Sequence, residues 1–242
     1  LSKNSFASPQ KQSNPVIAAL GHRRLSIVDT SPAGHQPMTL ANRYAIVYNG
    51  EVYNHVELRM ELQARGREFV SHSDTEVILQ AYDEWGVACL SRFNGMFAFV
   101  IYDIERDLVF AARDRFGVKP LYYYRSGANI AFASEIKQFT ALNGWKSVLN
   151  RNRGYDFLVY GIHEHTHETL FEGVYQLSPG SYYYGKRDNL LSYRGRIDTT
   201  KWYVFPADKR FRGSFDDAAR IFHDLLKDSI ALRLRADVPV GS

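Results

Sequence analysis

A nearly uninterrupted apolar run, Met-Phe-Ala-Phe-Val-Ile-Tyr at residues 96–102, limits the fold of this chain more than any other feature. A strand with one face in water alternates apolar and polar residues, whereas a continuous apolar strand is typical of one buried on both faces. We therefore expect this strand to lie inside a sheet that is covered on both sides, which requires a layered core.

Further short strands are predicted around this run, where β-branched and aromatic residues are bounded by Gly, Asn or other polar residues. They cover residues 16–20, 44–49, 108–112, 121–124, 129–133 and 182–184, and residues 236–242 have the same pattern. Only a few residues separate the strands in the middle of the chain, which is typical of antiparallel hairpins.

Helices are predicted where a polar capping residue precedes an apolar stripe. They start after Asn54, Ser73 and Ser214, with Glu57, Glu76 and Asp217 as second capping partners. Shorter helical segments are expected at residues 134–142 and up to Gly161. Two helices early, hairpins in the middle and helices after them indicate an α+β fold or a layered sandwich.

Composition excludes several classes of protein. With 45% hydrophobic residues the chain of 242 residues can form a globular core, so disordered and collagen-like classes are excluded. The 30 basic and 26 acidic residues are interspersed, so we expect no nucleic-acid partner. The absence of a membrane-length apolar run, and of a signal peptide in residues 1–14, predicts a cytoplasmic protein with no membrane partner. The single cysteine, Cys89, rules out an internal disulfide and is expected to be a core thiol.

Asn49 and Gly50 stand at the predicted end of the strand over residues 44–49. Because glycine has no Cβ, such a pair can present a side-chain amide and an unobstructed backbone N–H to one point in space, as an oxyanion hole requires. An Asn-Gly pair is also typical of a plain tight turn, so other segments must decide.

Seven separate blocks, in one order along the chain, resemble the class II glutamine amidotransferase domain of the glutamine-hydrolysing asparagine synthetases. They are GHRRLSIVD at 21–29, HQPM at 35–38, YNGEVYNH at 48–55, SDTE at 73–76, NGMFAFVIYD at 94–103, RDRFGVKPLYY at 113–123 and ASEIK at 133–137. One block alone would be a weak signal, whereas seven in order identify the family.

The resemblance implies an N-terminal-nucleophile hydrolase-type αββα sandwich, in which two antiparallel sheets pack face to face with helices outside. It assigns residues 1–205 to the amidotransferase domain, with its nucleophile segment missing. Residues 206–242 resemble the truncated start of an α/β ATP-pyrophosphatase-type synthetase domain.

The resemblance also assigns roles in binding glutamine. Arg24 would pair with the α-carboxylate through its planar guanidinium, although a purely structural arginine is the alternative. Asp74 and Glu51 would take the α-ammonium, although an Asp in a first helical turn is often only a cap. The remaining contacts are the Asn49 amide and the Gly50 N–H as an oxyanion hole, with backbone groups of Ile27 and Val28.

The family's nucleophile is a cysteine at the mature N-terminus, activated by its own α-amino group. Here Leu1 holds the first position, no cysteine precedes Arg24, and Cys89 lies in an apolar helical setting without a base. Either residues upstream of Leu1 exist or the domain has lost its activity, and the first is the simpler interpretation. The chain as given is expected to be inactive as a glutaminase.

The resemblance implies glutamine-dependent amide transfer: glutamine is hydrolysed to glutamate and ammonia for an ATP-dependent asparagine-synthetase-type reaction. No cofactor is expected in this chain, and ATP and Mg²⁺ are expected in the synthetase domain. The expected partners are glutamine and that domain, and a homodimer is compatible with the sequence. The alternatives are a relative with an acceptor other than aspartate, and an inactive module for glutamine binding or interdomain structure.

Two other motifs have a structural alternative. His163, His165 and His167 alternate, so on a strand they could share a face and bind a metal ion, but their polar surroundings favour an exposed loop and no metal is expected. Arg113 to Gly117 is similar to a phosphate-binding turn, and we interpret it as structural support for the sheet.

Overall fold

The apolar run forms most of strand β3 (Gly95–Asp103), which lies inside a six-stranded antiparallel sheet in the order β1-β2-β3-β4-β8-β9. The computed structural model describes residues 16–239 of the chain. Every β3 residue from Phe97 to Asp103 is buried, so the predicted two-sided cover of this strand is confirmed.

A second sheet of three antiparallel strands has the order β6-β5-β7. The other strands of the larger sheet are β1 (Met38–Leu40), β2 (Tyr44–Val52), β4 (Leu108–Arg113), β8 (Ser181–Lys186) and β9 (Thr200–Lys201). The smaller sheet contains β5 (Tyr122–Ser126), β6 (Asn129–Ala133) and β7 (Val174–Gln176).

Six α-helices and three 3₁₀ helices accompany the sheets in residues 16–239. The α-helices are α1 (His55–Ala64), α2 (Asp74–Trp85), α3 (Cys89–Arg92), α4 (Arg151–Tyr160), α5 (Arg187–Ser192) and α6 (Phe215–Arg233). The 3₁₀ helices are η1 (Pro32–Gly34), η2 (Gly86–Ala88) and η3 (Ile136–Ala141). None of the helices in this part of the chain is long and apolar enough to cross a lipid bilayer.

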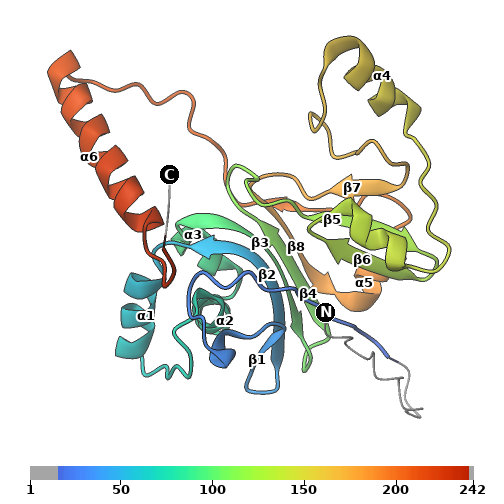
Figure 1. Ribbon diagram of the computed structural model, residues 1–242, viewed down its shortest axis with the longest axis horizontal. Helices are drawn as coiled ribbons and strands as arrows, with labels where there is room; N and C mark the ends of the chain where they lie inside the picture. Colours follow the sequence, from blue (N-terminus) through green and yellow to red (C-terminus); the bar gives the residue numbers. More distant parts are fainter. Residues whose placement is uncertain (1–15, 240–242) are drawn as a thin grey trace.

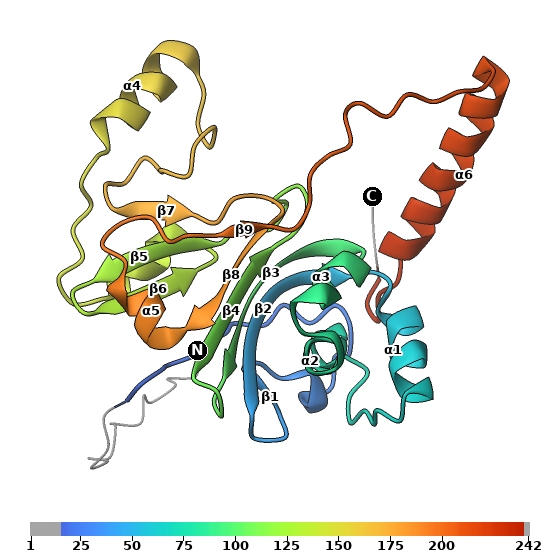
Figure 2. The ribbon, with the colours of Figure 1, turned by 180° about the vertical axis from the view of Figure 1, so that it is seen from behind.

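Side chains of β3 alternate between two cores, as the period of a strand requires. Phe97, Phe99 and Ile101 face a core shared with α1, α2 and α3. Ala98 and Val100 face a second core, shared with the smaller sheet. Figure 2 shows the three helices on one face of the larger sheet and β5, β6 and β7 on the other.

The outer face of the smaller sheet is covered by a third apolar cluster, in which Phe139 of η3 packs with Val174, Trp145 and Phe171. Helices, two sheets and this outer cover therefore follow one another as layers. Helices α4 and α6 project away from the layers (Figure 1), and α6 has no buried residue. The α+β prediction is confirmed, and the two antiparallel sheets pack face to face as expected.

Several strand predictions are confirmed, and three are corrected. Residues 16–20 are extended but form no strand, because no neighbouring strand accepts their backbone hydrogen bonds. Strand β2 does not end at Asn49 but continues to Val52, paired with β3. Residues 236–239 bend rather than form a strand, and the rest of that prediction, like the polar opening over residues 1–14, lies outside the described residues.

Two of the three predicted capping boxes are wrong, that of α2 in its second partner and that of α1 in its capping residue. Ser73 caps α2, but Glu76 accepts hydrogen bonds from the backbone of Val70 and Ser71 instead of from Ser73. Asn54 precedes α1 without capping it, because its side chain accepts from the Asn94 N–H at 2.8 Å. Only α6 has the complete box, between Ser214 and Asp217.

Cys89 lies in the core between the helices and the larger sheet, with no exposed surface, and burial raises the pKa of its thiol. The prediction of a core thiol is confirmed. Because a thiolate is the reactive form, we expect the native chain not to react with a disulfide reagent such as DTNB. In about 6 M guanidinium chloride, which unfolds domains of this kind, one thiol per chain should react. Stoichiometric labelling of the native chain would contradict this placement.

Candidate functional site

A pocket of about 130 Å³ lies where the segment before β1, the end of β2 and the start of α2 meet. Its walls come from parts of the chain far apart in sequence, including Lys119 from the turn after β4. All seven residues that the sequence analysis selected line this one pocket: Arg24, Ile27, Val28, Asn49, Gly50, Glu51 and Asp74.

Asp74, the first residue of α2, is held against β2. Its Oδ2 atom accepts hydrogen bonds from the Tyr48 hydroxyl at 2.7 Å and from the Val52 N–H at 3.0 Å. The residue is only 6% exposed, and burial raises the pKa of its carboxyl group even though both hydrogen bonds act in the opposite direction. The carboxylate is therefore fixed in position but poorly solvated.

Glu51 provides a second carboxylate in the same pocket. Burial, followed by the negative charge of Asp74, raises the pKa of Glu51, whereas the Lys119 ammonium lowers it. Among residues 16–239 the Glu51 side chain has no hydrogen-bond partner. Two carboxylates that repel one another in a partly buried pocket favour a bound cation, because the cation stabilises the charged form of both.

Arg24 holds the loop that contributes Ile27 and Val28 to the pocket. Its Nη1 atom donates to the Ser31 carbonyl at 3.1 Å, and Nη2 donates to the carbonyls of Val28, at 2.8 Å, and Asp29. A Cβ at Gly34 would lie 2.2 Å from Nη2, so only glycine leaves room for the guanidinium there. Arg24 therefore has the structural role that its sequence left open as an alternative to binding a carboxylate. Two of the five N–H donors of this group have no partner among the described residues.

Asp29, which sequence reasoning missed, connects this loop to α2. Its carboxylate accepts from the Ser31 N–H at 3.0 Å and from the His72 N–H at 2.8 Å, just before the cap of α2. Burial would raise the pKa of Asp29, but the hydrogen bonds from Ser31 and His72 outweigh it and lower that pKa. Its φ of 55° lies in the left-handed region, which aspartate tolerates better than most residues. An Asp before a Thr-Ser-Pro turn was the available sequence signal.

Asn49 and Gly50 lie within β2 rather than at its end. Gly50 has φ of 150°, and a Cβ there would lie 2.1 Å from the Met96 carbonyl oxygen of β3. The close approach that requires glycine is therefore between two strands, and the alternative of a plain tight turn at Asn49 and Gly50 is wrong. The Asn49 amide lines the pocket and has no hydrogen-bond partner in the part of the chain that the structure describes.

Gln36 and His22 also line the pocket and were not selected from the sequence. Gln36 accepts from the Tyr48 N–H at 2.7 Å and donates to the Thr75 hydroxyl at 3.3 Å, so it joins β2 to α2. Burial lowers the pKa of His22, whose buried Nδ1 has no partner among the described residues. His22 belongs to the block GHRRLSIVD and Gln36 to the block HQPM, and membership of these blocks was the sequence signal that could have identified them.

The turn after β4 is structural, as predicted, and it also places Lys119 at the pocket. The Arg113 guanidinium donates to the carbonyls of Gly117, Lys119 and Leu177, each at 2.8 Å. Asp114 accepts from the Lys119 N–H at 3.0 Å and from the Phe97 N–H of β3 at 3.1 Å. Lys119 therefore lies on a turn that these hydrogen bonds hold in place.

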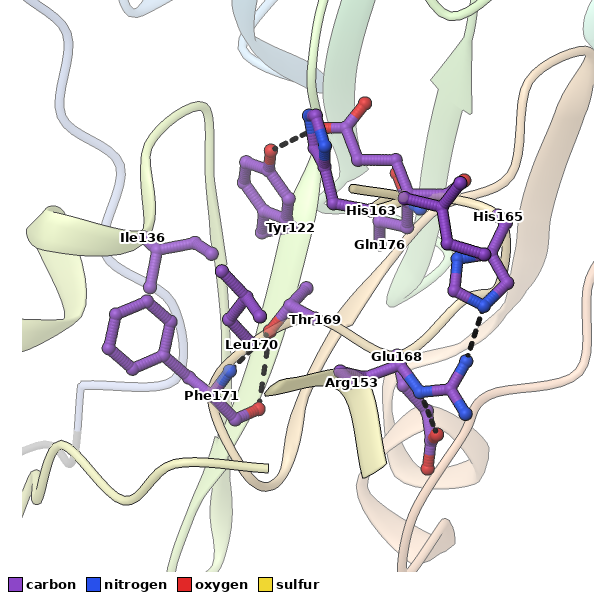
Figure 3. A pocket seen from close by; sticks show the side chains of 12 residues that line it. Tyr122, Ile136, Arg153, His163, His165, Glu168, Thr169, Leu170, Phe171 and Gln176 are labelled. Atoms are coloured by element: carbon purple, nitrogen blue, oxygen red, sulfur yellow. Dashed lines mark hydrogen bonds and ion pairs between the residues drawn. The ribbon is translucent and has the colours of Figure 1, made fainter. Parts of the chain in front are cut away.

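The three histidines lie in an exposed connector that forms no strand, so the loop interpretation is confirmed. Figure 3 shows His163 and His165 at a separate pocket beside Tyr122 and Arg153. His165 Nε2 lies 2.8 Å from Arg153 Nη1 and 3.1 Å from Asp156 Oδ2. Within residues 16–239 no group of three or more His, Cys, Asp or Glu side chains is placed to hold a metal ion.

Comparison with known proteins matches residues 11–196 to a family described as the glutamine amidotransferase domain. Asparagine synthetase [glutamine-hydrolyzing] 3 of Bacillus subtilis is 38% identical over 223 residues, which cover 91% of this chain and 35% of that protein. Amidase chry2 of Gibberella zeae is 34% identical over 229 residues, covering 92% of this chain and 32% of that protein. The chain spans about a third of the length of these curated relatives.

Among solved structures, glutamine phosphoribosylpyrophosphate (PRPP) amidotransferase from B. subtilis, complexed with ADP and GMP, has a similar fold. The TM-score is 0.52 at 20% sequence identity, and the match covers 76% of this chain and 34% of that one. The family match extends over more than half of the chain and includes every residue of the pocket. The chain therefore belongs to the glutamine amidotransferase domain family, homologous to the glutamine-hydrolysing asparagine synthetases.

Proposed function

We propose that this domain binds free glutamine in the pocket between β2, α2 and the Arg24 loop, and that it serves glutamine-dependent amide transfer of the asparagine synthetase type. The observation that carries the proposal is one pocket lined by the cationic side chains of Arg24 and Lys119 and by two poorly solvated carboxylates, Glu51 and Asp74. A free amino acid is a zwitterion, so it supplies a counter-charge to side chains of both signs.

The α-ammonium group of glutamine would bind Asp74 and Glu51. It relieves the repulsion between them and donates three N–H bonds where Glu51 has no partner among the described residues. The α-carboxylate would bind the two uncommitted N–H donors of Arg24, with the Lys119 ammonium as a second cation. This arrangement directs the side-chain amide toward Asn49 and Gly50.

In the proposed glutaminase reaction, a cysteine thiolate attacks the amide carbon of glutamine and a tetrahedral oxyanion forms. The Asn49 amide and the Gly50 N–H would stabilise that oxyanion by hydrogen bonds. Collapse of the intermediate breaks the C–N bond and releases ammonia, whose nitrogen takes up the proton lost by the thiol through the cysteine's α-amino group. Water then hydrolyses the remaining thioester to glutamate and restores the thiol. Cys89 cannot be this nucleophile, because its thiol is buried in the core and burial raises its pKa. We propose that the 242 residues bind glutamine without hydrolysing it.

We further propose that the layered sheets are the N-terminal-nucleophile hydrolase-type αββα sandwich and that residues 206–242 begin a synthetase-type domain. The relatives' greater length supports a second domain, and an extended segment separates β9 from α6. ATP and Mg²⁺ would bind in that domain. The ammonia released from glutamine would be its second substrate.

Replacing Asp74 by Asn should separate binding from stability. Both hydrogen bonds of the carboxylate reach Oδ2, so an Asn amide oxygen can keep them while the charge is lost. Loss of a charge-assisted bond to the α-ammonium should weaken glutamine binding about tenfold or more, measured by calorimetry. Glutamine should be compared with butyramide, which has the amide but lacks both α groups and should not bind.

The melting temperature of Asp74→Asn at pH 7 should equal or exceed that of the wild type. The folded-state pKa of Asp74 is raised, so its ionisation opposes folding at neutral pH, and the difference should shrink as the pH falls through that pKa. Asp83→Asn, on the same helix, is the matched control. Asp83 accepts from Tyr44 at 2.8 Å, away from the pocket, so this variant should lose stability and keep binding. Unchanged glutamine affinity in Asp74→Asn would refute the assignment.

The purified 242-residue chain should bind glutamine and release no ammonia from it. Binding is measured by calorimetry and ammonia by a coupled glutamate dehydrogenase assay, because the two readouts are independent. Cys89→Ser is the control, and it should leave the absence of ammonia unchanged. Ammonia release that Cys89→Ser abolishes would contradict the placement of the nucleophile outside these residues.

A further inference from the structure

A short segment after α6 returns to the glutamine pocket from the other end of the chain. Figures 1 and 2 both show the C-terminal end of α6 beside α1, although the rest of the helix projects away from the sheets. The segment from Arg233 to Asp237 contacts the pocket loop at Ile27 and Asp29 and the corner between β2 and α1 at Tyr53 and Glu57, and we name these five residues the clip.

The first contact joins the clip to the loop that Arg24 holds. Asp237 N–H donates to the Ile27 carbonyl at 2.9 Å, and Asp237 Oδ2 accepts from the Asp29 N–H at 2.7 Å. Ile27 lines the pocket. Asp29 has a left-handed backbone that needs support from its contacts, so its N–H bond to Asp237 fixes the loop directly.

The second contact joins the clip to the corner between β2 and α1. Arg235 binds both oxygens of Glu57, each at 2.6 Å, and donates to the Tyr53 carbonyl at 3.0 Å. The Arg233 guanidinium lies 4.7 Å from the centre of the Tyr53 ring. Tyr53 directly follows Val52, whose N–H binds Asp74. The clip therefore reaches the strand end that positions the buried carboxylate.

The two contacts are unequal. The side chains of Arg235 and Glu57 are 33% and 54% exposed, so solvent screens this pair and it contributes little to the geometry of the pocket. Asp237 is itself exposed, but its bonds go to backbone groups of the pocket loop, and Asp29 is only 5% exposed. Losing the Asp237 acceptor leaves the part-buried Asp29 N–H without its partner. Asp237 is therefore the residue to test.

We propose that the clip positions the pocket loop for glutamine, with Asp237 as a positioning residue, and so couples glutamine affinity to α6. The proposal rests on the proposed function, since it takes the pocket to be a glutamine site. Coupling of this kind is reciprocal: glutamine should tighten the clip by the same factor by which the clip tightens glutamine binding. A displacement of the C-terminal end of α6 would then weaken glutamine binding from outside the pocket.

The test compares three variants of the 242-residue chain by calorimetry with L-glutamine. Asp237→Ala should raise the dissociation constant about fivefold, the size expected for one hydrogen bond of about 1 kcal/mol. Asp237→Asn keeps an acceptor for the Asp29 N–H and should stay within about twofold of the wild type. Asp208→Ala removes a carboxylate from the segment between β9 and α6 and should change nothing.

Backbone hydrogen exchange gives the second readout. Glutamine should slow exchange of the Asp237 amide in the wild type, because that N–H donates to Ile27. In Asp237→Ala the Asp29 amide should exchange faster than in the wild type, with or without ligand. If the Asp237 contact only stabilised the fold, Asp237→Ala would lower the melting temperature, but glutamine would not slow exchange of the Asp237 amide in the wild type.

The results separate this proposal from the proposed function. Wild-type affinity in Asp237→Ala, or equal weakening in the Ala and Asn variants with a lowered melting temperature, overturns the clip. If the wild type binds no glutamine, the proposed function fails. The coupling to glutamine then fails with it, and only the anchoring of the loop by Asp237 is left to judge from the Asp29 amide: faster exchange in Asp237→Ala supports the anchoring, and unchanged exchange overturns it.

Discussion

The close approach of β2 to β3 is the constraint on which both the core and the pocket depend. Their register runs without a break from Tyr44 opposite Asp103 to Val52 opposite Gly95. At the pocket end a Cβ on Gly95 would lie 2.3 Å from the Glu51 carbonyl oxygen, and a Cβ on Gly50 would meet the Met96 carbonyl. Two glycines therefore let the strands approach closely where Asn49 and Glu51 line the pocket, and the aromatic core behind β3 holds the strands there.

The pocket itself is a place where the fold is less stable than it could be. Burial raises the pKa of both Asp74 and Glu51, so at neutral pH the empty site holds two carboxylates without a full counter-charge. A core selected for stability alone would not keep that arrangement, and such conflicts are typical of functional sites. In the proposed function, the ammonium of glutamine would supply the missing counter-charge to these carboxylates.

Much of this could be predicted from local sequence, and the failures have one cause. The apolar run over residues 96–102 and the Ser214 box depend on neighbours in sequence, and both are found as expected. The wrong capping partners, Asn54 and Glu76, bind backbone groups outside their own helices instead. Asp29 was missed because the partners that give it its role at the pocket lie 43 and 208 residues away, whereas its local bond to Ser31 indicates only a turn. The family blocks brought the seven pocket residues together, and no periodicity would have done so.

The same long separations set the order in which the molecule can form. Contacts between residues far apart in sequence close late, because loop closure costs entropy before the contact can contribute. The hairpin of β3 and β4 needs only a short turn, whereas the pocket joins Asp29 to His72 and then to Asp237. A chain with its sheets paired but its loop unanchored has no binding site. During refolding, ligand binding would therefore return last, after the helices and strands have formed.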